Sequence, residues 1–217
     1  MAKGLIFDMD GTMVDNMMVH HRAWQVKLKE MGMEMPIEEV MEKVHGVNEE
    51  ILERLFGDRY SAEERKMHSF EKEEAYRKIY KNEIKLIEGI KDLFEKMKSQ
   101  GIPMAIGTAA PEGNANFILD ELNLRSYFQG IFHAGHVKKG KPDPEVFQLA
   151  ADSMGLSTSE CLIFEDSITG AEAARRAGAK AIIINTTHRK EEFKQFDHIV
   201  AFINDYNDLD LDPYLAN

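Results

Sequence analysis

The sequence is poor in cysteine and lacks long apolar runs. Its 217 residues include one cysteine, Cys161, which excludes an internal disulfide and a zinc site built from several cysteines. No stretch reaches the roughly 18 consecutive apolar residues that a membrane-spanning helix needs. A secretion signal is not expected either, because the charged residues Asp8 and Asp10 follow soon after Met1. A single cysteine is typical of a reducing compartment, so we expect a cytoplasmic protein.

Positive charge is also scarce. Asp and Glu number 38 against 27 Lys and Arg, which gives a net charge of −11 at pH 7. An acidic surface repels phosphate backbones and anionic lipid headgroups, so we expect neither a nucleic-acid partner nor a membrane partner. The 43% hydrophobic and 30% charged fractions are those of a globular protein, which excludes a wholly disordered chain. The charge balance still permits one locally positive pocket.

Short apolar runs alternate with helical patterns over much of the chain. The runs that we predict to be strands lie at residues 4–7, 102–107, 131–132, 161–164 and 181–184. Strands that are apolar throughout and are separated by helices are typical of a parallel sheet covered on both faces. The sequence therefore predicts an α/β fold with a doubly wound, Rossmann-like parallel sheet.

One long segment interrupts this alternation. Residues 16–82 show helical periodicity and contain no strand candidate. Two apolar stripes at helical spacing fall in it, made of Trp24, Leu28 and Met31 and of Ile37, Val40, Met41 and Val44. Ser61 and Glu64 form a capping-box pattern that predicts a helix running toward Tyr80. We therefore predict a core at residues 1–15 and 83–217 and an inserted, all-helical cap at residues 16–82.

Polar residues follow three of the predicted strands. Asp8 and Asp10 follow the first strand, Thr108 follows the second, and Glu165 and Asp166 follow the fourth. Ligands of open parallel sheets bind at the carboxyl ends of the strands, so we expect these side chains to share one rim. Carboxylates and a hydroxyl without histidine suit Mg²⁺ better than zinc.

Lys141 is a further candidate for the same rim. It lies in the segment 140–144, Gly-Lys-Pro-Asp-Pro, whose two prolines stiffen the turn and delay the next helix. The lysine side chain therefore starts from a defined position.

Several of these motifs resemble one known family. The segment 8–15, Asp-Met-Asp-Gly-Thr-Met-Val-Asp, resembles the signature of the haloacid dehalogenase superfamily of phosphotransferases. Thr108, the lysine segment 140–144 and the segment 165–170 match the later motifs of that superfamily in the same order. The pattern His-x-x-Ala-Trp at residues 20–24 is similar to that of the β-phosphoglucomutase-like branch and its sugar-phosphatase relatives. The resemblance covers essentially the whole chain, and the helical insertion resembles the small cap of that superfamily.

The resemblance implies a set of catalytic roles. Asp8 would be the nucleophile that forms an aspartyl phosphate, and Asp10 would protonate the leaving oxygen and later deprotonate water. Thr108 and Lys141 would stabilise the oxygens of the transferring phosphoryl group.

The same resemblance implies a magnesium site. Asp8 and Asp166 would hold the ion by their carboxylates and Asp10 by its backbone carbonyl, while Glu165 would act either as a direct ligand or from behind the ligands. Mg²⁺ would screen the nucleophile from the phosphate that it attacks. Because carbon–halogen hydrolysis needs neither the metal nor a leaving-group acid, we favour phosphoryl transfer.

The cap is expected to select the substrate, with His20, Glu49 and Lys72 as candidate contacts. The mutase branch carries an arginine after a Gly-Val-Ser stretch as a clamp for a second phosphate, whereas residues 46–49 here read Gly-Val-Asn-Glu. We therefore predict a Mg²⁺-dependent phosphatase of a small phosphorylated metabolite, with a sugar phosphate as the leading candidate. The alternatives are a β-phosphoglucomutase, an inorganic pyrophosphatase and a non-catalytic binding module. The expected assembly is a monomer or a weak homodimer.

Overall fold

A computed structural model describes residues 1–207 and 209–216, and the chain divides into two compact units. One unit combines Met1–Asp15 with Lys85–Asn217, and the other is Asn16–Ile84. Residues 208 and 217 fall in the predicted core range but lie outside the described residues. We call the two units the core and the helical unit and describe each by itself.

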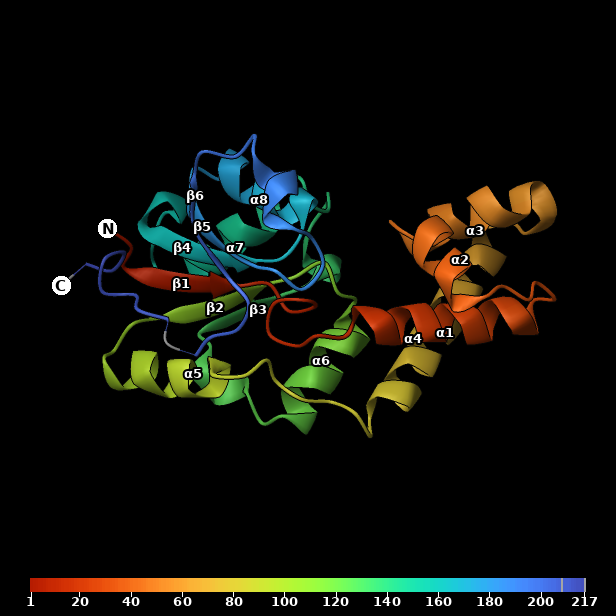
Figure 1. The fold of residues 1–217 in the computed structure, drawn as a ribbon, viewed down its shortest axis with the longest axis horizontal. Helices are drawn as coiled ribbons and strands as arrows, with labels where there is room; N and C mark the ends of the chain where they lie inside the picture. The colour runs from red at the N-terminus through yellow and green to blue at the C-terminus, as the bar shows by residue number, and fades with distance from the viewer. Residues whose placement is uncertain (208, 217) are drawn as a thin grey trace. The chain divides into compact units, whose positions relative to one another are not determined.

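The core contains a parallel sheet of six strands in the order β3-β2-β1-β4-β5-β6. The strands are β1 (Gly4–Phe7), β2 (Met104–Gly107), β3 (Gly130–Phe132), β4 (Cys161–Glu165), β5 (Lys180–Ile184) and β6 (Ile199–Ile203). Helices α5 (Ile90–Ser99) and α6 (Glu112–Glu121) cover one face, and α7 (Glu145–Ser153) and α8 (Ile168–Arg176) cover the other (Figure 1). This arrangement confirms the predicted doubly wound sheet.

Both faces of the central strands are buried. On one face, Phe7 of β1 stacks on Phe164 of β4 with ring centroids 4.5 Å apart and meets Phe94 of α5 edge-on at 5.2 Å. On the other, Ile6 and Ile163 belong to a buried cluster with residues of α7 and α8. A strand buried on both sides needs apolar residues at every position, which explains the uninterrupted runs in the sequence.

Two details of the sheet differ from the sequence prediction. Strand β2 begins at Met104 rather than at residue 102, because Pro103 has no N–H to give to a ladder. Strand β6 was not predicted. It pairs only with β5 at the edge of the sheet, and its side chains are half-buried, although its residues 199–203, Ile-Val-Ala-Phe-Ile, are an apolar run.

The helical unit contains four α-helices: α1 (Met17–Glu30), α2 (Ile37–Lys43), α3 (Asn48–Phe56) and α4 (Ala62–Tyr80). The predicted capping box is confirmed, since Ser61 Oγ accepts from the backbone N–H of Glu64 while the Glu64 side chain accepts from that of Ser61. Helix α4 ends at Tyr80, as predicted. Among the described helices, none is both long enough and apolar enough to cross a bilayer.

The first predicted stripe of the helical unit is buried, and the second is buried in part. Trp24, Leu28 and Met31 pack together in one cluster, which Val40 and Val44 join. Met41 was also expected in this core, but 47% of its surface is exposed. Adjacent residues on a helix point about 100° apart, so a helix of seven residues that buries Val40 turns Met41 toward solvent.

The described residues also form five short 3₁₀ helices. They are η1 (Gly57–Arg59), η2 (Arg125–Tyr127), η3 (Ala134–His136), η4 (Thr158–Glu160) and η5 (Lys190–Phe193).

Candidate active site

The predicted carboxylates meet at the point where the strand order reverses. Strands β1 and β4 are neighbours, but the chain leaves β1 toward β2 on one side and leaves β4 toward β5 on the other. Asp8 directly follows β1, Glu165 ends β4, and Asp166 comes next. Oxygen atoms of these three buried carboxylates lie within 4.8 Å of one another. The sheet topology therefore gathers three acidic groups that are far apart in the sequence.

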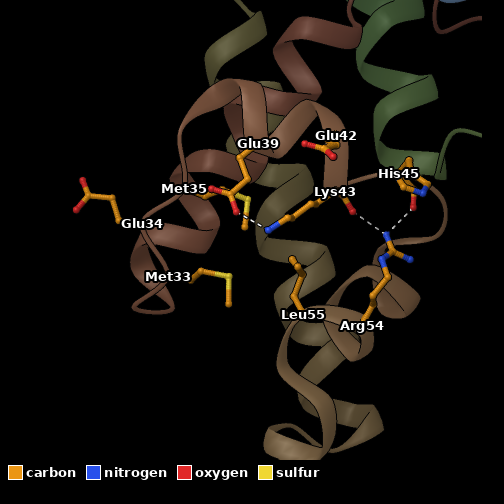
Figure 2. A pocket seen from close by; sticks show the side chains of 9 residues that line it. All are labelled: Met33, Glu34, Met35, Glu39, Glu42, Lys43, His45, Arg54 and Leu55. Carbon is orange, nitrogen blue, oxygen red and sulfur yellow. Dashed lines mark hydrogen bonds and ion pairs between the residues drawn. The ribbon is translucent and has the colours of Figure 1, made fainter.

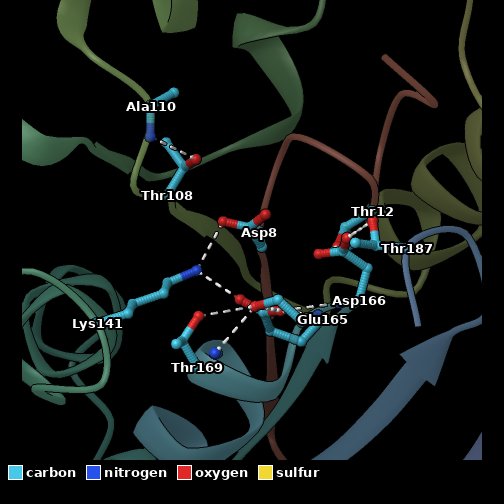
Figure 3. Close-up of polar contacts among 11 residues, drawn as sticks. Asp8, Thr12, Thr108, Ala110, Lys141, Glu165, Asp166, Thr169 and Thr187 are labelled. Atoms are coloured by element: carbon cyan, nitrogen blue, oxygen red, sulfur yellow. Dashed lines mark hydrogen bonds and ion pairs between the residues drawn. The ribbon is translucent and has the colours of Figure 1, made fainter. Parts of the chain in front are cut away.

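Lys141 joins the carboxylates from the segment before α7 (Figure 3). Its Nζ lies 2.7 Å from Asp8 Oδ1 and 2.6 Å from Glu165 Oε1, and only 6% of its side chain is exposed. The aliphatic chain places Nζ 4.6 Å from the ring centroid of Phe147 in α7. The Lys141–Pro142 peptide bond is cis. We call Asp8, Lys141, Glu165 and Asp166 the rim cluster.

Glu165 is held at both carboxylate oxygens. Oε1 accepts from Lys141, while Oε2 accepts from the backbone N–H groups of Asp166 and Ser167, both at 2.8 Å, and from Ser167 Oγ at 2.9 Å. A Cβ atom on Gly170 would lie 1.7 Å from Oε1, so the carboxylate requires glycine there. Glu165 is thus fixed between α8 and the lysine, with its hydrogen-bonding capacity largely in use.

Asp166 is oriented by the loop that follows β5. Thr187 Oγ1 donates to Asp166 Oδ2, and Thr12 Oγ1 lies 3.5 Å from Oδ1. Gly11 has φ +74°, and a Cβ atom there would come within 2.1 Å of Asp166 Oδ2. Only glycine combines this backbone conformation with such a close approach.

Burial dominates the electrostatics of the cluster. It raises the pKa of Asp8 to about 7, although Lys141 acts in the opposite direction, and the charge of Asp10 adds to the rise. Burial also raises the pKa of Asp166 well above its usual range. Burial likewise raises the pKa of Glu165, but Lys141 and the backbone N–H groups outweigh it, so the net shift is downward. Three carboxylates against one ammonium leave a site that favours a cation.

Thr108 and Asp10 both lie at the carboxyl edge of the sheet. Thr108 follows β2, which neighbours β1, and it is 1% exposed; its Oγ1 accepts from the backbone N–H of Ala110 at 3.1 Å (Figure 3). Asp10 is half-buried, and its backbone bridges to that of Val14. Both residues therefore stand next to the rim cluster in the core.

The three predicted cap contacts belong to the helical unit. The structure brings His20 and Lys72 together, with Lys72 Nζ 2.9 Å from His20 Nδ1 and 2.9 Å from Glu73 Oε1. The His20 ring stacks on Tyr76 at 4.0 Å with an interplanar angle of 6°. Burial, to which the positive charge of Lys72 adds, lowers the pKa of His20 to about 3. The imidazole is therefore neutral at physiological pH.

The contacts described above for His20 and Lys72 do not include Glu49. It lies half-buried in the first turn of α3, beside Asn48, whose side-chain amide donates to Glu73 Oε1 at 2.7 Å. We call His20, Asn48, Lys72, Glu73 and Tyr76 the cap cluster.

Thr187, which contacts the rim cluster, and Glu73 of the cap cluster were not identified as site residues from the sequence. Thr187 follows the predicted strand at 181–184, so the rule that identified Asp8 and Thr108 could have found it. Glu73 had no such signal, because a glutamate on a charged helix is normally solvated. Only the folded structure shows that Glu73 is 9% exposed, whereas the next residue, Glu74, is exposed to solvent.

The helical unit also contains a cavity of about 680 Å³ (Figure 2). Its walls include an ion pair between Lys43 and Glu39 and the side chain of Arg54, which donates to the backbone oxygens of Lys43 and His45 at 2.9 Å each. It contains none of the predicted site residues, so it is separate from the candidate chemistry.

Comparison with known proteins gives consistent matches. A family model of the haloacid dehalogenase-like hydrolases matches residues 2–178. The fructose-1-phosphate phosphatase YqaB of Escherichia coli (strain K12) is 32% identical over 182 residues, covering 82% of this chain and 94% of that protein. The crystal structure of a HAD hydrolase, family IA, variant 3, from Entamoeba histolytica HM-1:IMSS has a TM-score of 0.89 at 29% identity and covers 97% of this chain and 96% of its own. A β-phosphoglucomutase from Clostridium difficile has a TM-score of 0.81 at 26% identity, with 97% and 94% covered.

Proposed function

The chain belongs to the haloacid dehalogenase-like hydrolase family, and on that premise we propose that it is a Mg²⁺-dependent phosphatase of a sugar phosphate. The observation that carries the proposal is the rim cluster. A buried carboxylate, Asp8, faces a buried ammonium group and lies within reach of two further carboxylates at the switch point of the sheet. This arrangement supplies a nucleophile together with positive charge for phosphate oxygens.

The residues of the rim fit a magnesium ion. The carboxylates of Asp8 and Asp166 and the backbone carbonyl of Asp10 would hold it, and hard oxygen ligands are those that Mg²⁺ prefers. Glu165 would stay behind these ligands, because its oxygens already accept from Lys141 and from the start of α8. When bound, Mg²⁺ supplies the positive charge that lets a phosphate group approach the Asp8 carboxylate.

The protein's own residues then perform two displacements. An Asp8 carboxylate oxygen attacks phosphorus and forms an aspartyl phosphate, while the bond to the sugar oxygen breaks and Asp10 donates a proton to that oxygen. Asp10, now a carboxylate, takes a proton from water as the water attacks the aspartyl phosphate and releases inorganic phosphate. Lys141 and Thr108 stabilise the phosphoryl oxygens in both steps.

A sugar phosphate suits the groups that the helical unit offers. The cap cluster combines an ammonium, a carboxylate and a neutral imidazole, which are groups that bind hydroxyls. The related Escherichia coli protein bears the name of a sugar phosphate phosphatase. Glu49, in the position where a mutase needs a cation for its second phosphate, favours hydrolysis over mutase chemistry.

We also propose a cytoplasmic location and a monomeric or weakly dimeric state. The single cysteine, Cys161, is buried, and burial raises the pKa of its thiol to about 12. Light scattering of the purified protein over a range of concentrations would test the assembly.

The test is phosphate release by the purified protein with Mg²⁺ across a panel of sugar phosphates, nucleotides and pyrophosphate. We expect turnover of a sugar phosphate, and we expect Asp8→Asn to reduce it by about 10³-fold or more. Asp15→Asn is the matched control, because Asp15 lies in the same segment but is exposed. Circular dichroism checks that both variants fold.

Two outcomes would contradict the proposal. Conversion of β-glucose 1-phosphate to glucose 6-phosphate faster than phosphate release would favour a mutase. Preferred hydrolysis of pyrophosphate would exclude a sugar phosphate as the principal substrate.

A further inference from the structure

Two histidines follow strand β3 and pack against each other in η3. The rings of His133 and His136 have centroids 3.8 Å apart. His133 is 8% exposed, whereas His136 is exposed to solvent. Nothing in the proposed reaction uses either residue.

Both imidazoles serve as hydrogen-bond acceptors for the backbone. His136 Nδ1 accepts from the backbone N–H of His133, and His133 Nδ1 accepts from that of Gly135, both at 3.2 Å. The turn is closed by the backbone N–H of His136, which donates to the carbonyl of His133 at 2.9 Å. A ring nitrogen that accepts carries no proton, so each neutral imidazole holds its proton on Nε2.

The residues before and after His133 form backbone hydrogen bonds with the segment that carries Thr108. The backbone N–H of Thr108 donates to the carbonyl of Phe132 at 2.9 Å, and the N–H of Ala134 donates to the carbonyl of Ala110 at 3.0 Å. The N–H of Ala110 in turn donates to Thr108 Oγ1. The backbone of residues 132–134 thus fixes the segment 108–110 at both ends.

We propose that His133 and His136 are positioning residues that hold the Thr108 segment for phosphoryl transfer while both imidazoles are neutral. Protonation of either Nδ1 would set an N–H group against a backbone N–H, and the turn would lose one of its two side-chain acceptors. Two imidazolium rings at this separation would also repel each other. The catalytic part of this inference rests on the proposed function, whereas the tautomers and the turn do not.

The surroundings of His133 oppose its protonation. Burial lowers its pKa, a positive charge on His136 lowers it further, and Glu112, the first residue of α6, raises it. The net shift is downward from 6.5. Neutral His133 therefore contributes stability that is fully present above the unfolded-state pKa of about 6.5 and is lost as the pH falls through its lower, folded-state pKa.

Two double variants distinguish the loss of the side-chain hydrogen-bond acceptors from the loss of a group that can be protonated. Asparagine places Oδ1 on Cγ where histidine has Nδ1, so H133N/H136N keeps both acceptors but cannot be protonated. H133A/H136A removes the acceptors. At pH 7.5 we expect the alanine variant to lose about tenfold in kcat with little change in KM, because a misplaced Thr108 affects the reaction more than binding. The asparagine variant should recover most of that loss.

The pH profile gives a second readout. The ratio of kcat for the unaltered protein to kcat for H133N/H136N should fall as the pH decreases through the folded-state pKa of His133, which lies below 6.5, since titrations common to both proteins cancel in the ratio. A ratio that is independent of pH, or an alanine variant with unchanged kcat, would overturn the positioning role.

Two measurements do not depend on turnover. Long-range ¹H–¹⁵N spectra of histidine-labelled protein should show unprotonated Nδ1 and protonated Nε2 at both residues at pH 7.5. The melting temperature of the unaltered protein should fall more steeply below pH 6.5 than that of H133N/H136N. Protonated Nδ1 at either residue would refute the inference even if the phosphatase activity is found, whereas the expected spectra without any phosphatase activity would refute only the proposed function.

Discussion

The core and the helical unit each bury a lysine that contacts carboxylate, but the described groups around the two lysines differ. The side chains of Lys141 and Lys72 are 6% and 3% exposed. In the rim cluster, Lys141 contacts two carboxylates and a third lies close by. In the cap cluster, Lys72 contacts the carboxylate of Glu73 and the imidazole of His20, which stays neutral because burial lowers its pKa to about 3.

This difference suits the two clusters to different ligands in the proposed function. In the proposed function, the carboxylates of Asp8 and Asp166 would hold a divalent cation, and that cation would attract a phosphate. The ammonium, carboxylate and neutral imidazole of the cap cluster would contact the hydroxyl groups of the sugar. We therefore propose that the groups around each buried lysine set the ligand of its cluster.

The largest effect is expected from Asp166→Asn, which would sharpen the contrast in metal binding. We expect a loss of about 10³-fold in activity and no rise of the melting temperature on addition of Mg²⁺, because a metal ligand is gone. Without Mg²⁺ the variant should be at least as stable as the unaltered protein, since a buried carboxylate becomes neutral. Thermal unfolding over a titration of Mg²⁺ measures both.

Glu73→Gln is the matched control in the cap cluster. It should keep the rise of melting temperature caused by Mg²⁺. If it abolishes that rise while Asp166→Asn preserves it, the two clusters have been assigned the wrong ligands.

An intermediate effect is expected when each lysine is replaced by methionine, which has a similar shape but no charge. Lys141→Met should lower kcat by about 10²-fold to 10³-fold, because in the proposed reaction its ammonium stabilises the phosphoryl oxygens. Lys72→Met should raise KM by about tenfold with a smaller change in kcat, because its contacts are with substrate hydroxyls in the proposed reaction. Steady-state kinetics distinguishes the two, and equal effects on kcat would remove the contrast.

Both methionine variants leave carboxylates without their cation, so their folding is measured separately. The free energy of unfolding in urea should fall for Lys141→Met, because Asp8 and Glu165 lose their ammonium partner, and for Lys72→Met, because Glu73 does.

The smallest effect is expected from removing one hydrogen bond to the glutamate beside each lysine. Asn48→Ala removes the amide that donates to Glu73 and should cost about 1 kcal/mol of stability. Ser167→Ala removes a donor to Glu165 and also the cap of α8, where Ser167 Oγ accepts from Gly170, so it should cost about 2 kcal/mol. Urea unfolding of both variants checks the order, and a larger cost for Asn48→Ala would contradict it.

Much of the fold could be predicted because its signals are local. Apolar runs marked five of the six strands, and the pattern at Ser61 and Glu64 marked the start of α4. The predictions that were wrong lie where tertiary contacts outweigh the local pattern. Strand β6 is half-buried at the sheet edge, and Met41 is exposed because a short helix has only a narrow buried face.

The candidate site was predictable only as far as strand ends reveal it. Asp8, Thr108 and Asp166 follow strands, and a parallel sheet brings such positions to one rim. The sequence did not reveal that the Glu165 carboxylate accepts hydrogen bonds from Lys141 and from the start of α8. The sequence analysis therefore left open whether Glu165 is a metal ligand. Thr187, which donates a hydrogen bond to Asp166, also follows a predicted strand, but the sequence analysis did not identify it.

By itself, the sequence determined that this chain forms a doubly wound sheet with a helical insertion and carries acidic motifs at its strand ends. Residue type and spacing suffice for this, because periodicity specifies which side chains are buried and where each element ends. The tertiary structure alone decided the partners. Lys141 reaches Asp8 across 133 positions of sequence because α7, which follows the lysine segment, packs against β1 and β2, and a distance of 2.7 Å depends on that long-range packing.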